Sequence, residues 1–295
     1  MQLKTVGLLS PGEMGHVVAK VLIEKGMPVV TCLEDRSELT RSLAKQVGIR
    51  EVESYNQLVS ESDMILSILV PAEAKKVAEK VVVATNATGD QIIYVECNAI
   101  APNTTKSINK IMTEAGNPFV DAGIIGPPPR KKTTTRFYAS GKDAEKFEEL
   151  KNYGLDIRIV GPEIGQASGL KMCYAALTKG TAALSTELLV AASKMGLIKS
   201  LAEEFQLSQL QPYTALERGL PSMPTKARRW IGEMEEIAKT FEDVGMTPKI
   251  YQGAAELYEF VGKSSLADET FESRDKNRTL IEMIDILKET LEKSS

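Results

Sequence analysis

Six residues near the start of the chain, 10–15 (S-P-G-E-M-G), have the types and spacing of a turn that binds phosphate. The apolar run 5–9 before them predicts a buried strand, and apolar residues recur at helical spacing over 14–25. A strand, a glycine turn and a helix together aim the free N–H groups of a helix N-terminus at a phosphate. Gly12 would let a pyrophosphate approach the backbone, and Gly15 would let the helix pack on the strand. This context favours a dinucleotide site. The dinucleotide-binding motif is G-x-G-x-x-G, and Ser10 stands in the place of its first glycine.

A lysine on a long predicted helix is the second residue with the potential for chemistry. Residues 164–197 are rich in Ala, Leu, Met and Val, which predicts one helix of about thirty residues, roughly 45 Å long, buried on nearly all sides. Polar side chains interrupt it in one stripe, at steps of three and four: Lys171, Tyr174, Thr178, Thr181 and Ser185. The stripe is either a solvent-facing or snorkelling edge or the lining of a cleft between two domains. In a cleft, desolvation would tune the ammonium group of Lys171 toward acid–base work.

Alternating strands and helices must position these residues. Over 1–163, short apolar strands alternate with helical segments, which predicts an α/β fold with a doubly wound parallel sheet of the Rossmann type. The ligand of such a sheet lies in the crevice beyond the carboxyl ends of the strands. Beyond Gly161 the patterns are helical and no strand is convincing. We therefore expect a dinucleotide-binding domain over 1–163 and an all-α domain over 164–295, which the long helix enters.

The composition bounds the class of protein. The 295 residues are 43% apolar and carry a net charge of −4, which suits two domains with ordinary cores. The mildly acidic balance gives no broad basic field for nucleic acid, and no apolar run reaches membrane-spanning length. No charged leader precedes the first strand, and the three cysteines lie in apolar segments, so we expect a cytoplasmic protein with reduced thiols. No cluster of histidine, cysteine and carboxylate has metal-ligand spacing, and we expect no metal.

Four stretches of the chain, in the right order, resemble the β-hydroxyacid dehydrogenase family, whose larger relative is 6-phosphogluconate dehydrogenase. They are VGLLSPGEMG, VECNAIAPNT, FVDAGIIGPPP and GQASGLKMCYAALTKG, and the resemblance covers residues 5–180. The later stretch KARRWIGEMEEIAKTF resembles a poorly characterised helical domain that occurs in one branch of these proteins. The joint occurrence of the four stretches is far more specific than any one of them.

The resemblance implies a cofactor site, a substrate site and a catalytic lysine. It places NADP or NAD along the ends of the first strands, at Ser10, Pro11, Gly12, Glu13, Met14, Gly15, Arg36, Ser37, Leu69, Val70, Pro71 and Asn98. It places a small substrate with a carboxylate at Gly123, Ile124, Ile125, Gly126 and Tyr174. Lys171 matches the family's lysine, which acts as the general acid when a carbonyl is reduced and as the general base in reverse.

Two departures from the family's pattern concern the substrate. Ile125 replaces a serine that usually offers its hydroxyl, and Tyr174 and Ala175 stand where an asparagine normally follows the lysine by one turn. The implied substrate is a small carboxylate-bearing alcohol or carbonyl, in a pocket more apolar than is usual. Two alternatives stay open: an imine or enamine reductase, and a protein that binds a dinucleotide without turnover.

The loop after the second predicted strand bears on the choice of cofactor. Glu34 and Asp35 favour NAD, because a carboxylate at this place would hold the ribose hydroxyls. Arg36, Ser37 and Arg41 favour NADP, because an arginine beside a helix cap would accept the extra phosphate. The loop is longer than is usual in the family that the chain resembles, which brings Arg36 and Ser37 into register with the Arg-Thr or Arg-Ser pair of its NADP-linked members and favours NADP.

The second half of the chain adds weaker candidates and a prediction of assembly. Trp230 and Glu233 fall at helical spacing, which more often serves packing than a site. Because Trp230 follows two arginines, we retain Arg228, Trp230 and Glu233 as residues that could close over a substrate. The long lysine helix exceeds what the core of one domain needs, so we expect a homodimer formed through the helical domain.

Overall fold

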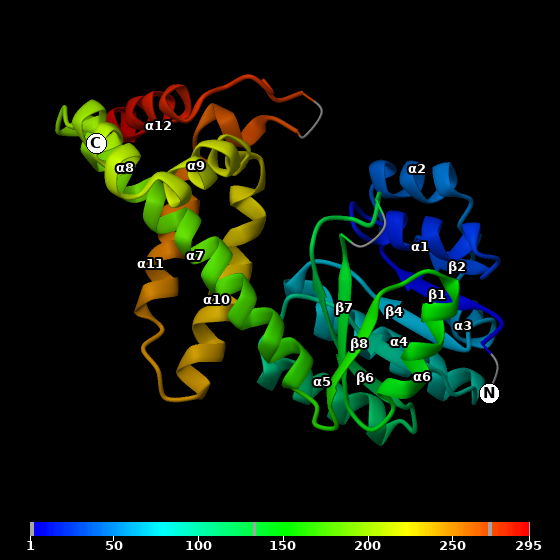
Figure 1. The fold of residues 1–295 in the computed structure, drawn as a ribbon. Helices are drawn as coiled ribbons and strands as arrows, with labels where there is room; N and C mark the ends of the chain where they lie inside the picture. Colours follow the sequence, from blue (N-terminus) through cyan, green and yellow to red (C-terminus); the bar gives the residue numbers. More distant parts are fainter. Residues whose placement is uncertain (1–2, 132–133, 271–272, 295) are drawn as a thin grey trace. The chain divides into compact units, whose positions relative to one another are not determined.

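The computed structural model describes residues 3–131, 134–270 and 273–294. The strands are β1 Val6–Leu9, β2 Val29–Cys32, β3 Arg50–Val52, β4 Met64–Ser67, β5 Ile93–Glu96, β6 Phe119–Ile125, β7 Arg136–Ser140 and β8 Ile157–Gly161. The helices are α1 Gly15–Glu24, α2 Glu38–Val47, α3 Tyr55–Ser60, α4 Ala74–Thr88, α5 Pro102–Glu114, α6 Ala144–Glu148, α7 Gln166–Lys194, α8 Ile198–Ser208, α9 Leu210–Gly219, α10 Ala227–Asp243, α11 Lys249–Gly262 and α12 Leu280–Ser294. These elements form two compact units, Met1–Tyr174 and Ala175–Ser295 (Figure 1).

One sheet of eight strands, in the order β3-β2-β1-β4-β5-β6-β7-β8, organises the first unit. Strands β1 to β6 are parallel, and the order reverses direction between β1 and β4. The predicted Rossmann-type fold is therefore confirmed, and its switch point lies where the loops after β1 and β4 begin. Helices cover the sheet as Figure 1 shows.

Strand β7 departs from the predicted all-parallel sheet, because it runs antiparallel to β6. The segment 126–135 that joins the two strands contains no helix among its described residues. Parallel neighbours need a crossover connection of a dozen or more residues, usually a helix, so the direct return makes this pair antiparallel. Strand β8 then pairs in parallel with β7.

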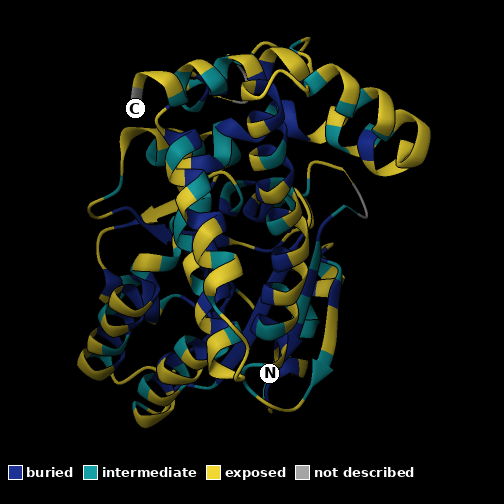
Figure 2. Cartoon of the chain, turned by 90° about the vertical axis from the view of Figure 1, so that its left-hand side faces the viewer, coloured by how far each residue is buried: buried dark blue, intermediate teal, exposed yellow. Residues whose placement is uncertain are grey.

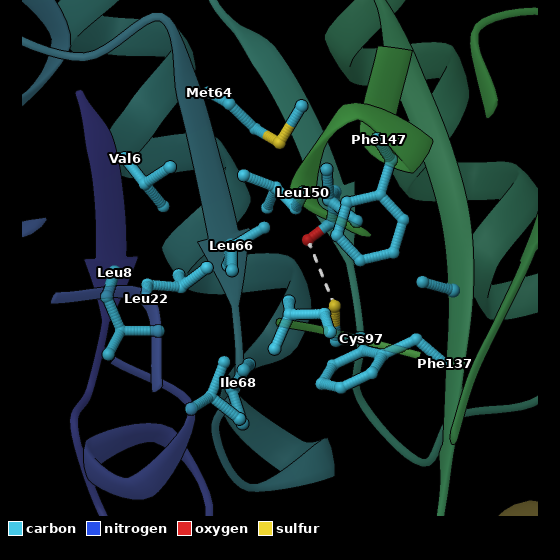
Figure 3. Close-up of a cluster of buried hydrophobic side chains, with 14 of the residues drawn as sticks. Val6, Leu8, Leu22, Met64, Leu66, Ile68, Cys97, Phe137, Phe147 and Leu150 are labelled. Atoms are coloured by element: carbon cyan, nitrogen blue, oxygen red, sulfur yellow. Dashed lines mark hydrogen bonds between the residues drawn. The ribbon is translucent and has the colours of Figure 1, made fainter. Parts of the chain in front are cut away.

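The core of the first unit lies on both faces of the sheet. Along β4, Met64 and Leu66 pack in one buried cluster with Phe137 and Phe147 (Figure 3). Ile65 packs in a second cluster on the other face of the sheet. Continuous apolar strands are what a sheet covered on both faces requires. In Figure 2 the helices carry exposed residues, in yellow, in alternation with buried residues, in dark blue.

Helix α7 is continuous over 29 residues, as the sequence predicted. The division between the two units falls after Tyr174, inside this helix and not in the loop before it. The prediction that α7 is buried on nearly all sides is wrong for one face, where Leu177 is 71% and Leu184 64% exposed. No described part of the chain covers this face.

The second unit is all-helical over its described residues, as predicted. Helices α10 and α11 pack along each other through two aromatic pairs. The ring centres of Trp230 and Tyr258 lie 5.3 Å apart, and those of Phe241 and Tyr251 lie 4.7 Å apart. Ring contacts of this kind fix the spacing of two helices and add to the stability that burial gives.

Candidate functional site

The turn between β1 and α1 is compact. Ser10 has a φ of 59°, in the left-handed region that favours glycine, and its carbonyl accepts a hydrogen bond of 2.6 Å from the N–H of Gly12. A Cβ on Gly15 would lie 3.1 Å from the Ser10 oxygen, so glycine allows α1 to approach β1. A Cβ on Gly12 would meet only that oxygen, at 3.9 Å, which leaves open space above the turn. Pro11, Glu13 and Met14 complete the turn, and this space fits the close approach of a pyrophosphate.

The loop after β2 contains the residues that bear on the cofactor's ribose. Ser37 is the N-cap of α2, as its sequence position predicts, and its hydroxyl accepts the N–H of Thr40. The guanidinium group of Arg41 donates hydrogen bonds to the carbonyl of Leu33 at 2.7 Å and to the carboxylate of Glu51 at 2.9 Å. The Nε of Arg36, by contrast, is buried and has no hydrogen-bond partner in the described structure. An unsatisfied guanidinium nitrogen is costly, and a rearrangement of the Arg36 side chain toward an anion bound at this loop would satisfy it.

Asn98 connects the loops that follow β4 and β5. Its side-chain oxygen accepts the N–H of Leu69 at 2.6 Å, and its amide nitrogen donates to the Ser67 hydroxyl at 2.9 Å. Asn98 is buried, whereas Val70 is exposed and Pro71 half-buried. The structure therefore brings Asn98 and residues 69–71 together at the switch point, next to the turn after β1.

The predicted catalytic lysine and the predicted substrate segment also come together. A Cβ on Gly123 would lie 2.9 Å from the carbonyl oxygen of Ala167 and 2.9 Å from the Cβ of Lys171. The first turns of α7 therefore lie directly on β6, and this contact fixes the half-buried Lys171 beside the strand.

The other predicted substrate residues differ in accessibility. Ile124 and Ile125 are buried within the ladder between β6 and β7, and Gly126 is the first exposed residue beyond it. Tyr174 lies on α7 one turn after Lys171, and its side chain is 46% exposed.

A buried aspartate holds the start of α7 to the sheet. The Oδ2 atom of Asp121, on β6, accepts the N–H groups of Gly165 and Ser168 at 2.8 and 3.1 Å and the hydroxyls of Ser140 and Ser168 at 3.0 and 3.1 Å. Burial raises the pKa of the Asp121 carboxyl, and the hydrogen bonds from Ser168, Gly165 and Ser140 oppose this shift. Asp121 thus acts as an anchor for the helix that carries Lys171.

A second buried carboxyl lies on the neighbouring strand. Glu96 on β5 is 1% exposed, and its Oε1 accepts the N–H of Asn98 at 2.8 Å. Burial raises the pKa of Glu96 to about 8, hydrogen bonds from Asn98 and Ser67 oppose this shift, and the charge of Asp121 adds to it. The sequence analysis missed both carboxyls, although a charged residue inside an otherwise apolar strand was the signal that could have found them.

The candidates in the second unit are engaged in contacts that hold that unit together. Glu233 forms a buried ion pair with Lys179, whose pKa is lowered by burial in spite of this partner. The Nζ of Lys179 lies 5.4 Å from the ring centre of Trp230. Arg228 donates to the carbonyl of Gly262 at 2.9 Å and to Asp268 at 2.7 Å. These contacts give Arg228, Trp230 and Glu233 a role in packing, and their predicted role in substrate binding stays a prediction.

Two searches of the described residues concern other kinds of site. Within 3–131, 134–270 and 273–294, no group of three or more His, Cys, Asp or Glu side chains is arranged to hold a metal ion. No helix among the same residues has the length and apolar character needed to cross a membrane.

The strand order and the glycine turn define a Rossmann-type dinucleotide-binding protein. Residues 5–153 match the domain family described as the NAD binding domain of 6-phosphogluconate dehydrogenase. The chain belongs to this family of NAD-binding dehydrogenases, and the predicted resemblance is confirmed. Residues 192–261 match a domain of unknown function, DUF1932.

Relatives of the whole chain support this assignment. An uncharacterised 28.5 kDa protein of Methanothermus fervidus is 31% identical over 260 residues, which cover 87% of this chain and 98% of that protein. The solved structure of a conserved protein of unknown function, reported as similar to 3-hydroxyacid dehydrogenases, is 31% identical, with a TM-score of 0.68 and coverage of 88% and 96%. Mycobacterium tuberculosis 3-hydroxyisobutyrate dehydrogenase shares the fold at 16% identity, with a TM-score of 0.72 and coverage of 98% and 99%.

The close contact at Gly123 gives a first testable prediction. In Gly123→Ala the added methyl group would press α7 away from β6, so we expect the free energy of unfolding to fall by about 1–3 kcal/mol. Urea unfolding followed by circular dichroism measures this. Gly12→Ala is the matched control, because it adds the same group where only one atom lies within 4 Å. Equal stability of the two variants would contradict the contact.

Proposed function

We propose that this protein is an NAD(P)-dependent dehydrogenase or reductase that acts on a small carboxylate-bearing alcohol or carbonyl. Lys171 would be its general acid and base. The observation that carries the proposal is the contact of Lys171 with Gly123, because it sets a proton-transferring group beside the predicted substrate segment. Membership of the NAD-binding dehydrogenase family supplies the second half of the chemistry.

Different residues of the chain would bind the cofactor, transfer the proton and bind the substrate. The turn 10–15 would hold the pyrophosphate against the N-terminus of α1, and residues 69–71 with Asn98 would border the nicotinamide. A bound nicotinamide supplies or accepts a hydride. The Nζ of Lys171 would donate a proton to the carbonyl oxygen during reduction and remove it from the hydroxyl during oxidation. Backbone near Gly126, where β6 leaves its ladder, would bind the substrate carboxylate.

Replacing the lysine tests this assignment. In Lys171→Met we expect turnover of small oxo-acids, measured by cofactor oxidation, to fall by about 10²- to 10⁴-fold, because the general acid is lost. Calorimetry should show unchanged cofactor binding. Lys194→Met, the same change in the last turn of α7, is the control and should leave turnover intact.

The same variant separates the proposed activity from its alternatives. Turnover of cyclic imines that survives Lys171→Met would identify an imine or enamine reductase instead. Cofactor binding without turnover of any oxo-acid, semialdehyde or imine would favour a protein that binds a dinucleotide without catalysis.

We further propose that the cofactor is NADP. The support is the buried, unpartnered Nε of Arg36 beside the N-cap Ser37, a pair suited to a phosphate on the ribose.

Arg36→Ala should therefore weaken the binding of NADPH by about 10- to 100-fold, the value of one or more charge-assisted hydrogen bonds, and leave NADH binding unchanged. Calorimetry with both nucleotides measures the effect. Arg41→Ala is the matched control, because that guanidinium already has protein partners. Equal losses for both nucleotides in Arg36→Ala would argue against NADP.

We also propose a homodimer that forms through α7. A row of residues along this helix and just beyond it, spaced alternately by four and three, includes several large exposed side chains and no charge: Leu170, Tyr174, Leu177, Thr181, Leu184, Leu188, Ala191 and Met195. We call this row the α7 stripe. It extends for about 38 Å, and alternate spacing of apolar residues is the pattern by which helices pair with a copy of themselves.

Charges placed on the α7 stripe should break the dimer. We expect the double variant Leu177→Glu, Leu184→Glu to sediment as a monomer at micromolar concentration while the unchanged chain sediments as a dimer, because two carboxylates would be buried without partners. Leu39→Glu is the control, since Leu39 is 69% exposed and lies on α2, away from the stripe. A monomer for the unchanged chain would refute the proposal.

A further inference from the structure

The two buried carboxyls of the sheet lie next to each other. Glu96 and Asp121 are Cα partners in the parallel ladder between β5 and β6. Partners on neighbouring strands are about 5 Å apart and point to the same face of the sheet. Tyr94 and Phe119, the partners two positions earlier, show that this holds here, because their rings stack with centres 6.0 Å apart. The side chains of Glu96 and Asp121 therefore project from neighbouring strands on the same face of the sheet.

Each carboxyl has one oxygen that is satisfied and one that is not. Oε1 of Glu96 accepts the N–H of Asn98, and Oδ2 of Asp121 accepts four donors. Oε2 of Glu96 and Oδ1 of Asp121 are buried and have no hydrogen-bond partner. Among the described residues, neither carboxyl forms an ion pair with Lys, Arg or His. Two adjacent buried charges without a cation would be strongly unfavourable.

We propose that Glu96 and Asp121 share one proton, carried on Oε2 of Glu96 and donated to Oδ1 of Asp121, and that this pair positions Lys171. One proton satisfies both orphaned oxygens and removes one of the two buried charges. Asp121 keeps the negative charge because the four donors at its Oδ2 stabilise it. Glu96 keeps the proton, in agreement with its raised pKa of about 8.

The pair connects both halves of the proposed active site. On one side, Glu96 holds the backbone of Asn98, whose side chain holds Leu69. On the other side, Asp121 holds Gly165 and Ser168 at the start of α7, one turn before Lys171. Glu96 and Asp121 are thus positioning residues that act through Asn98 and α7. This part of the inference rests on the proposed function, whereas the shared proton does not.

Stability as a function of pH tests the shared proton without cofactor or substrate. The folded-state pKa of Glu96, about 8, lies above its ordinary value of 4.5, so folding takes up a proton between these values. The stabilisation is complete below pH 4.5 and is lost as the pH rises to 8. Over this range the unfolding constant should rise by up to tenfold per pH unit, and it should level off above pH 8.

The variant Glu96→Gln should remove this pH dependence and keep the stability measured at pH 5, because its amide oxygen can accept from Asn98 and its NH₂ can donate to Asp121. Asp121→Asn should weaken the pH dependence, because the charge of Asp121 no longer raises the pKa of Glu96, whereas the larger effect of burial stays. The nearby Tyr94 and Cys97 do not interfere, because burial raises the pKa of both above this range. An unchanged slope in Glu96→Gln would overturn the shared proton.

The positioning role has its own measurement. We expect kcat of the unchanged enzyme to decline as the pH rises through 8, because ionised Glu96 would repel Asp121 and loosen the start of α7. In Glu96→Gln this decline should move to higher pH. Coinciding pH profiles would overturn the positioning role and leave the shared proton intact. An enzyme without turnover would refute the proposed function, and the unfolding experiment would still decide the shared proton.

Discussion

The arrangement of the first unit depends on the contact between helix α7 and strand β6. Gly123 offers no side chain, so the helix backbone at Ala167 and the Cβ of Lys171 lie directly on the strand. Two residues earlier, Asp121 accepts the N–H groups at the start of the same helix. A negative charge at a helix N-terminus is favourable, and a glycine is the residue that permits the closest approach. Together they fix the first turns of α7, up to Tyr174, against β6.

The two units treat buried charge in different ways. In the second unit the buried Lys179 is paired with Glu233, and its position over the Trp230 ring adds a cation–π contact. In the sheet of the first unit, Asp121 is surrounded by neutral donors and has no cationic partner among the described residues. An ion pair neutralises charge inside a helical packing core, whereas neutral donors leave a carboxylate charged at the place where a helix must be anchored.

The spacing of apolar residues along the chain sufficed to predict most of the fold, because local patterns define the strands and helices of an α/β unit. The turn after β1 and the N-cap Ser37 were readable for the same reason. The direction of β7 was not, since it depends on how residues 126–135 connect two strands. The hydrogen bonds of Asp121 with Gly165 and Ser168 and the pairing of Lys179 with Glu233 join residues 44 or more positions apart. Only strand register and helix packing bring such residues together.

The anchoring of α7 by Asp121 has a consequence for how the chain can be divided. The match to the NAD-binding family ends at residue 153, and the sequence placed the domain boundary at 163. A fragment cut at either place would lack Gly165 and Ser168, and the buried Oδ2 of Asp121 would keep only Ser140 of its four donors. Desolvating a carboxylate with so few donors opposes folding. The shortest autonomously folding piece of the dinucleotide-binding half therefore includes the first turns of the next domain's helix, to about Tyr174.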